Sequence, residues 1–212
     1  MSFKYDLFSL NVRGIGDEFK RRSIFHWLHK CHQGIVFLQE THISIQTEKM
    51  WRSEWGSKVL FSHGTSNSRG VAILFPNNIE YTIKKTISDT EGRFLIGEVE
   101  IEETVFILCN VHAPTKDHTE EQSNFLTKLR EECLQYLDSN IIIGGDFNAI
   151  LNPKLDKRGG RSDTRSDYVN NLINFIEEFD LIDIWRVLNP DLFMFTWRSI
   201  NPPPYNADLT IW

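Results

Sequence analysis

Ile141-Ile-Ile-Gly-Gly-Asp-Phe-Asn148 is the stretch that says most about how this chain folds. Three β-branched residues in a row predict a central strand that is buried on both faces. The two glycines allow the backbone to turn tightly beside a ligand. Asp146 and Asn148 are two residues apart in an extended segment, so their side chains point to the same side and suit a phosphoester site. The same Gly-Asp-x-Asn pattern is also ordinary turn chemistry, in which both side chains bond local backbone groups.

Three other apolar segments end in polar residues in the same way. They are residues 7–11, 35–42 and 105–114, and their polar ends are Asn11, Glu40, and Asn110 with His112. Polar side chains gather where neighbouring strands finish, so we expect a concave site rich in oxygen ligands and poor in thiolates. Hard ions such as Mg²⁺ prefer that set of ligands.

The apolar periodicity predicts more strands than helices. Strands are expected near residues 5–11, 35–39, 58–62, 70–75, 80–87, 93–101, 104–111, 141–146, 193–198 and 207–212, and helices near 17–31, 45–54, 119–137 and 166–179. In the third helix Thr119 and Gln122 predict a capping box. Its apolar face is expected to consist of Phe125, Leu129, Cys133 and Leu137. Short turns between strands favour two mostly antiparallel sheets flanked by helices, an α/β (α+β) class.

Composition fits one globular domain over residues 1–212, because 41% of the residues are hydrophobic and 25% are charged. The longest apolar run is far short of a membrane span. Met1 leads into a strand without an apolar signal core, so we expect an intracellular protein, nuclear or cytoplasmic, that is not secreted. Cys31, Cys109 and Cys133 have unrelated spacings, which predicts buried thiols rather than a disulfide framework or a zinc ribbon.

A net charge of −6 argues against strong non-specific binding of nucleic acid, although it does not exclude a nuclease. Two local basic clusters lie near the polar strand ends. They consist of Arg13, Lys20, Arg21 and Arg22, and of Lys154, Lys157, Arg158, Arg161 and Arg165. Each cluster has two interpretations, a surface for substrate phosphates or an ordinary solvated face.

The motifs occur in an order that resembles the endonuclease/exonuclease/phosphatase superfamily and, within it, the endonucleases of non-LTR retrotransposons. The residues that carry the resemblance are 10–14, 37–42, 144–148, 155–160 and 195–197. The resemblance implies a four-layer sandwich of two sheets flanked by helices. It also implies Mg²⁺ as cofactor, with Mn²⁺ as a substitute, and DNA as partner. We expect no membrane association and no obligate protein partner.

A phosphodiester could be hydrolysed at this site by water and one Mg²⁺. Glu40 is the expected principal metal ligand, with Asn11 beside it. Asp146 is expected to orient or deprotonate the attacking water, and Asn148 to donate to the phosphate in the transition state. The residues expected to organise the site rather than react are Asn110 and Thr196.

The sequence departs from the family pattern at two places. His112 stands where relatives usually carry tyrosine, and its imidazole, although shorter, can donate a hydrogen bond to phosphate. The family's last strands carry an Arg-x-Asp-like segment, for which Asp208 is the candidate, and then Ser-Asp-His. No Ser-Asp-His is present, and all seven histidines lie at or before His118. We therefore expect the last strands to be missing and the domain to be incomplete at its C-terminus.

Three functions are compatible with these patterns. The favoured function is a Mg²⁺-dependent phosphodiesterase of retrotransposon-endonuclease type that nicks DNA, impaired by the loss of Ser-Asp-His. The second is a phosphatase or phospholipid phosphodiesterase on the same scaffold. The third is a catalytically silent relic that acts as a binding module.

Overall fold

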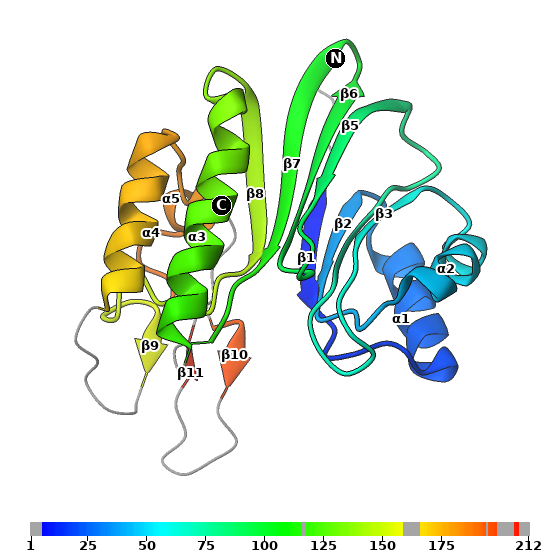
Figure 1. The fold of residues 1–212 in the computed structure, drawn as a ribbon, viewed down its shortest axis with the longest axis horizontal. Helices are drawn as coiled ribbons and strands as arrows, with labels where there is room; N and C mark the ends of the chain where they lie inside the picture. Colours follow the sequence, from blue (N-terminus) through cyan, green and yellow to red (C-terminus); the bar gives the residue numbers. More distant parts are fainter. Residues whose placement is uncertain (1–5, 116–117, 159–165, 194, 199–205, 208–212) are drawn as a thin grey trace. The chain divides into compact units, whose positions relative to one another are not determined.

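Two four-stranded sheets contain most of the strands (Figure 1). The structure is a computed structural model and describes residues 6–115, 118–158, 166–193, 195–198 and 206–207. The chain divides into two compact units. The first contains the residues up to His112 together with Asp138–Gly145, and the second contains Ala113–Leu137 and the residues from Asp146 onward.

The first sheet has the strand order β1-β2-β4-β3. Its strands are β1 (Leu7–Asn11), β2 (Ile35–Gln39), β3 (Val59–Ser62) and β4 (Val71–Leu74). β1 and β2 are parallel, with Asn11 opposite Gln39, whereas β4 is antiparallel to both β2 and β3. Because β1 and β2 run in the same direction, the residues that follow them emerge at one edge of the sheet.

The second sheet has the order β5-β6-β7-β8. Its strands are β5 (Tyr81–Ser88), β6 (Phe94–Ile101), β7 (Thr104–His112) and β8 (Asn140–Asp146), and the β5–β6 and β6–β7 pairs are antiparallel. The prediction of a central strand at Ile141–Ile143 was wrong, because β8 ends this sheet among the described strands. Ile143 is buried, but Ile141 and Ile142 are only partly buried.

Alternating side chains of the first sheet serve two separate cores. On one face, Phe37 and Ile73 pack against Leu95 and Leu108 of the second sheet. On the other face, residues such as Leu38 pack against helices α1 (Glu18–Cys31) and α2 (Glu48–Trp55). The strand period of two therefore places the second sheet and the helices on opposite faces of the first sheet.

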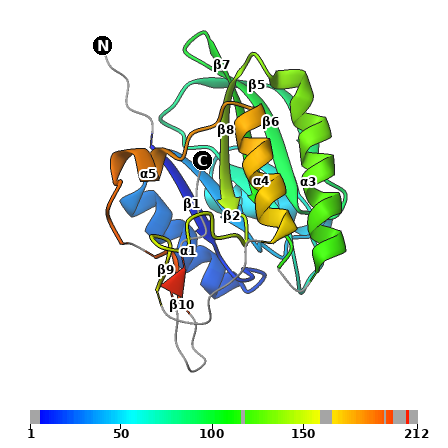
Figure 2. The same cartoon turned by 90° about the vertical axis from the view of Figure 1, so that its left-hand side faces the viewer.

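The second unit contains three α-helices and three short strands among its described residues. The helices are α3 (Thr119–Cys133), α4 (Asp167–Glu178) and α5 (Ile184–Leu188), and the strands are β9 (Lys157–Arg158), β10 (Trp197–Arg198) and β11 (Asn206–Ala207). Antiparallel pairing gives these strands the order β10-β11-β9. α3 and α4 lie side by side (Figure 2), and the Arg130 guanidinium bonds both carboxylate oxygens of Glu178 across them.

Most of the predicted elements are present, with ends that differ by a few residues. The helix predicted near 45–54 begins as a 3₁₀ turn, Ile45–Thr47, and the one predicted over 119–137 ends in a second turn, Leu134–Tyr136. α5 and β9 were not predicted. The described part of the strand expected at 207–212 is β11, since residues 208–212 lie outside the described range. Among the described residues, no helix combines the length and apolar character needed to cross a membrane.

Three side-chain predictions were wrong. The N-cap of α3 is His118 rather than Thr119, and the buried Gln122 amide donates to the Pro114 carbonyl instead of closing a capping box. Leu137 lies beyond the helix and is exposed, so the four-residue repeat does not continue onto it. Cys31 is exposed, whereas the other two cysteines are buried, and all three are free thiols.

Candidate active site

Asn11 and Glu40 meet at the edge where the parallel strands β1 and β2 end. The Asn11 Nδ2 donates to the Glu40 Oε1 at 2.8 Å, while the Asn11 Oδ1 accepts from the Arg13 backbone N–H at 3.0 Å. Glu40 has a φ of 52°, a left-handed conformation that non-glycine residues adopt only at a cost in stability. Asn11 therefore holds a carboxylate whose backbone is strained.

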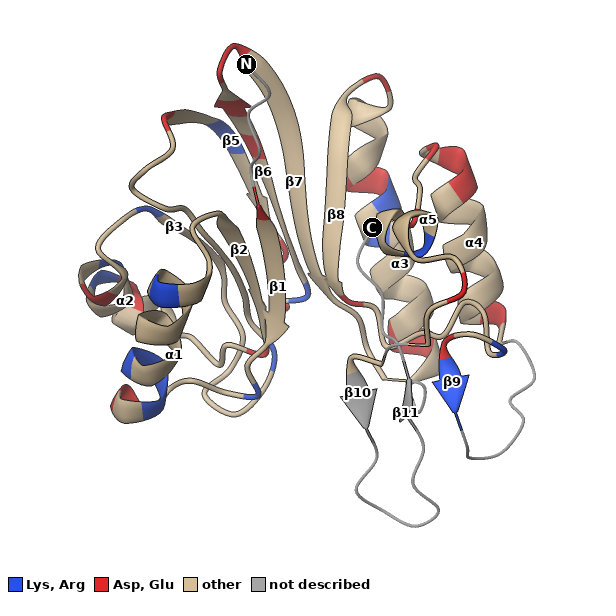
Figure 3. Cartoon of the chain, turned by 180° about the vertical axis from the view of Figure 1, so that it is seen from behind, with Lys and Arg blue, Asp and Glu red and all other residues tan. Residues whose placement is uncertain are grey.

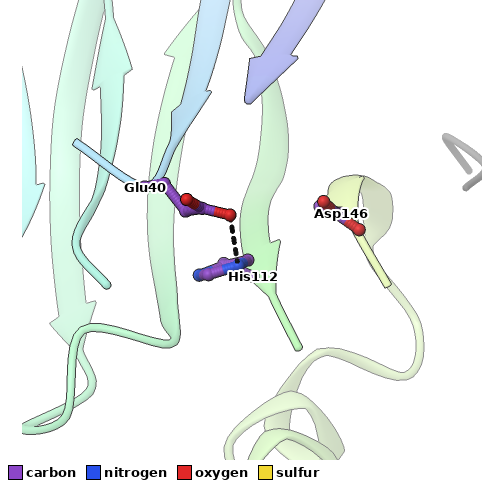
Figure 4. A group of neighbouring side chains, drawn as sticks. All are labelled: Glu40, His112 and Asp146. Carbon is purple, nitrogen blue, oxygen red and sulfur yellow. Dashed lines mark ion pairs between the residues drawn. The ribbon is translucent and has the colours of Figure 1, made fainter. Parts of the chain in front are cut away.

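His112 reaches the same carboxylate from the end of β7. Its Nε2 lies 3.4 Å from the Glu40 Oε1, and Figure 4 shows the carboxylate directed toward the ring. The His112 backbone N–H donates to the Arg93 carbonyl at 2.7 Å, which fixes the end of the strand. The His112 Nδ1 is buried and has no hydrogen-bond partner among the described atoms. The structure thus brings together three of the predicted site residues: Asn11, Glu40 and His112.

Glu40 is an ionised carboxylate at neutral pH. The hydrogen bond from His112, assisted by that from Asn11 and by the charges of His112 and His42, lowers the pKa of Glu40 to about 2, although burial opposes this effect. A carboxylate with so low a pKa does not need to lose a proton before it binds a cation.

His42 is a site residue that the sequence interpretation missed. It lies two residues after Glu40 and has a φ of 55°. Burial lowers the pKa of His42, and the Glu40 charge opposes that effect. A Cβ at Gly14, whose φ is 73°, would lie 2.6 Å from the His42 Nδ1, so the ring packs where only glycine leaves room. The polar run after β2 was the available signal, because it includes His42 as well as Glu40.

Asn110 lies inside the first unit rather than at its surface. It is fully buried, and its Oδ1 accepts from the Gln39 Nε2 at 2.7 Å. Its Nδ2 donates to the carbonyl oxygens of Leu38 and Ala72 at 2.9 and 2.8 Å. Asn110 on β7 thereby links its own sheet to β2 and β4 of the other sheet.

Asp146 and Asn148 belong to the second unit, in which they engage the local backbone. Asp146, also drawn in Figure 4, is the last residue of β8, and its Oδ1 accepts from the Asn148 N–H at 3.0 Å. The Asn148 Nδ2 donates to the Ala113 carbonyl at 2.7 Å, and Asn148 has a φ of 49°. The buried Tyr168 hydroxyl donates to the Phe147 carbonyl at 3.0 Å and anchors the intervening residue. This is the turn chemistry that the sequence offered as its alternative interpretation, and it fixes the directions of both side chains.

Two further predicted site residues lie elsewhere. Thr196 is an exposed residue in a bend before β10. Asp208 lies outside the described residues, as do Arg161 and Arg165 of the second basic cluster. The described members of that cluster are the exposed Lys154 and Arg158 and the half-buried Lys157.

Figure 3 colours lysine and arginine blue, including those on α1, and most side chains of this basic cluster have intramolecular partners. The Lys20 ammonium donates to three backbone carbonyls. Arg21 is fully buried against Glu54, and Arg22 contacts both Glu18 and Glu54. These three cations therefore stabilise the protein itself, whereas the exposed Arg13 side chain has no such partner among the described residues.

Residues 8–207 match the model of the Endonuclease/Exonuclease/phosphatase family. A curated relative, the Transposon TX1 uncharacterized 149 kDa protein of Xenopus laevis, is 32% identical over 194 residues. That alignment covers 91% of this chain but only 14% of the transposon protein. The chain is thus similar to a small part of a much longer protein.

Solved structures share the fold at low sequence identity. An AP endonuclease from Archaeoglobus fulgidus superposes with a TM-score of 0.64 at 18% identity, covering 92% of this chain and 77% of that one. The endonuclease domain of TRAS1, a telomere-specific non-LTR retrotransposon, gives 0.63 at 12% identity, covering 98% and 84%. TDP2 from Caenorhabditis elegans gives 0.64 at 18% identity, covering 99% and 63%. The predicted resemblance and the predicted α/β sandwich of two helix-flanked sheets are both confirmed.

Proposed function

This chain belongs to the endonuclease/exonuclease/phosphatase family, and we propose that it is a phosphodiesterase that nicks DNA with a divalent metal ion bound at Glu40. The observation that carries the proposal is the ionised Glu40 carboxylate between the Asn11 amide and the His112 imidazole. The choice of DNA is supported by the likeness to a transposon protein and to a retrotransposon endonuclease domain. We also propose that it acts inside the cell, in keeping with the likeness to transposon and retrotransposon proteins.

The residues present fit a divalent cation. Two neighbouring ligands of one ion, each bonded at about 2.1 Å, lie roughly 3.0–3.4 Å apart. The Glu40 Oε1 and the His112 Nε2 are separated by 3.4 Å, at the upper end of that range, and the imidazole would give up the Nε2 proton that it now directs to Glu40 in order to bind the ion. A carboxylate suits Mg²⁺, while an imidazole nitrogen is a better ligand for transition metals. The pair therefore favours Mn²⁺ over Mg²⁺, and both ions belong in the test.

We assign Asp146 to the same reaction. Glu40, His112 and Asp146 each offer one ligand atom to an ion. Asp146 follows Gly145 directly, and its carbonyl accepts from the N–H of Ala113, the residue after His112. In this reaction Asp146 would orient or deprotonate the attacking water, while the Asn148 N–H keeps the carboxylate in one direction.

Within this mechanism Glu40 supplies negative charge, and Asn11 holds it in place through Nδ2. A bound Mg²⁺ or Mn²⁺ would stabilise charge on the scissile phosphate and on the leaving oxygen.

Metal binding is the first test. Mn²⁺ and Mg²⁺ are titrated into the protein by calorimetry, and the melting temperature is followed in parallel. A ligand at 100 times its Kd stabilises the folded state by about 2.7 kcal/mol. Glu40→Gln should abolish most of the heat and of the shift, whereas Glu80→Gln, at an exposed carboxylate of the same unit, should preserve both. Equal metal-induced shifts in wild-type protein and Glu40→Gln would assign the metal to other residues.

Substrate class is the second test. Supercoiled plasmid, a phosphate monoester and phospholipid vesicles are each incubated with the protein and Mn²⁺, with Asp146→Asn as the blank. Nicking that is lost in Asp146→Asn supports the endonuclease. Hydrolysis of only the monoester or the phospholipid would replace it by the phosphatase or lipid phosphodiesterase. Metal binding without hydrolysis of any of the three would identify a binding module.

A further inference from the structure

The loop Val12–Gly16, between β1 and α1, is held by two cations of α1. The Lys20 Nζ donates to three successive carbonyl oxygens, those of Val12, Arg13 and Gly14, at 2.9, 2.9 and 2.7 Å. The Arg21 Nη1 donates to the next two, those of Ile15 and Gly16, at 3.2 and 2.9 Å. All five carbonyl groups of the loop are thus hydrogen-bonded to one helix, although the loop has no regular secondary structure.

The N–H groups of the loop are directed to the segment that carries Glu40. Val12, Gly14 and Ile15 donate to the carbonyl oxygens of Gln39, Glu40 and Thr41 at 2.9, 2.7 and 3.2 Å. The Arg13 N–H donates to the Asn11 side chain at 3.0 Å, and that side chain also bonds the Glu40 carboxylate. The loop is therefore fixed alongside Glu40 by bonds on both sides of its backbone.

Arg13 is the one residue of this loop with a long charged side chain. It is exposed, and its guanidinium makes no hydrogen bond or ion pair with any described residue. Its φ of 48° is left-handed, a conformation that glycine or asparagine adopts more readily. Local stability therefore does not explain an arginine at this position.

We propose that Arg13 binds a backbone phosphate of DNA beside the Glu40 site. The inference rests on the proposed function and adds a substrate contact to it. A guanidinium presents a planar fork of donors that matches the oxygens of a phosphate. Because the loop is already rigid, little backbone entropy remains to be lost on binding. The chain has a net charge of −6, so its overall charge does not attract DNA. An arginine that is fixed beside the site can nevertheless bind a DNA phosphate locally.

The test separates this contact from catalysis by measuring binding without metal. A fluorescein-labelled DNA duplex is titrated in EDTA at several salt concentrations, and anisotropy gives the Kd. Arg13→Asn removes the charge and keeps a residue that tolerates a positive φ, while Arg13→Lys keeps the charge. The matched control is Arg22→Gln, which removes one charge from a side chain that is 63% exposed and paired with Glu18.

Arg13→Asn should weaken binding roughly three- to tenfold and should reduce the slope of log K against log salt by about one. Arg13→Lys should restore the slope, and Arg22→Gln should leave it unchanged. Unaltered melting temperatures establish that the variants are folded. The contact is refuted if wild-type protein binds DNA and Arg13→Asn binds it with the same affinity and the same salt slope. It is also refuted if Arg22→Gln weakens DNA binding as much as Arg13→Asn does. In both cases the proposed nuclease stands. A wild-type protein without DNA affinity at low salt refutes both, and calorimetry at Glu40 then still reports the metal site.

Discussion

Replacing Glu54 by alanine should destabilise the first unit strongly, because it leaves the Arg21 guanidinium buried without its counter-ion. Arg21 is fully buried, and it bonds Glu54 through Nε–Oε2 at 2.6 Å and Nη2–Oε1 at 3.0 Å. Breaking a buried ion pair by removing one partner costs roughly 3–5 kcal/mol. Since folded domains are stable by only about 5–15 kcal/mol, Glu54→Ala should remove a large part of the free energy of unfolding.

Urea unfolding followed by tryptophan fluorescence measures this free energy. Trp51 and Trp55 are suitable reporters, because both are buried on α2 in the core cluster that α1 and α2 share. The control is Glu18→Ala, since Glu18 pairs with Arg22 at 2.9 Å on the exposed surface of α1. Exposed pairs of this spacing contribute about 0.3–0.5 kcal/mol. Equal losses in Glu54→Ala and Glu18→Ala would refute the argument from burial.

The double variant Arg21→Met with Glu54→Ala distinguishes an unpaired charge from lost packing. It should be more stable than Glu54→Ala alone, because methionine removes the buried charge and retains apolar volume.

The pH dependence of stability gives an independent check. Hydrogen bonds from Arg21 lower the pKa of Glu54 below its ordinary 4.5. The stability that ionised Glu54 contributes is therefore present above pH 4.5 and is lost as the pH falls through the folded pKa. The difference between wild-type protein and Glu54→Gln should shrink accordingly in acid.

Two other substitutions test the framework of the site. Gly145→Ala should destabilise the protein by roughly 1–3 kcal/mol or more, because a Cβ there would lie 2.0 Å from the Val111 carbonyl oxygen. The control is Gly16→Ala, whose Cβ meets nothing within 4 Å and which should be neutral in the same urea titration. Asn110→Ala should cost about 2–4 kcal/mol, because it leaves buried carbonyl groups of two strands without a donor, and an unchanged urea midpoint would contradict that role.

The meeting of Asn11 and Glu40 was predictable, because it depends on two short patterns. Asn11 and Glu40 each follow an apolar run, and neighbouring parallel strands end at the same edge of a sheet. The edge position of β8 was not predictable in the same way. Three isoleucines indicate a buried strand, but the strand order depends on pairing between segments that are distant in sequence. Gly145, whose φ is 140°, packs against the Val111 backbone. Glycine is therefore needed here because two strands approach each other closely, and not because a ligand binds.

The basic residues near α1 show where sequence patterns fail. Lys20, Arg21 and Arg22 are adjacent and look alike in the sequence, yet one binds loop carbonyls, one is buried and one is largely exposed. Helical geometry separates neighbours by about 100°, so each meets a different environment. The environment of Arg21 includes Glu54, which lies 33 residues away in the sequence. Basic residues that are adjacent in the sequence therefore need not form one basic surface, because each side chain can have a different partner.

Backbone strain joins these observations. Eight described non-glycine residues have a positive φ, and four of them, Arg13, Glu40, His42 and Asn148, lie within three residues after the ends of β1, β2 and β8. Glycine at these positions would relieve the strain, but it would also remove the cation, carboxylate, imidazole and amide that these residues carry. Part of that strain is offset by hydrogen bonds: the Arg13 and Asn148 N–H groups donate to the Asn11 and Asp146 side chains, and Lys20 donates to the Arg13 carbonyl. Neighbouring residues thus hold the residues after these strand ends in a strained backbone conformation. Such strain is expected where the chemistry of the side chain, rather than local stability, decides which residue occupies a position.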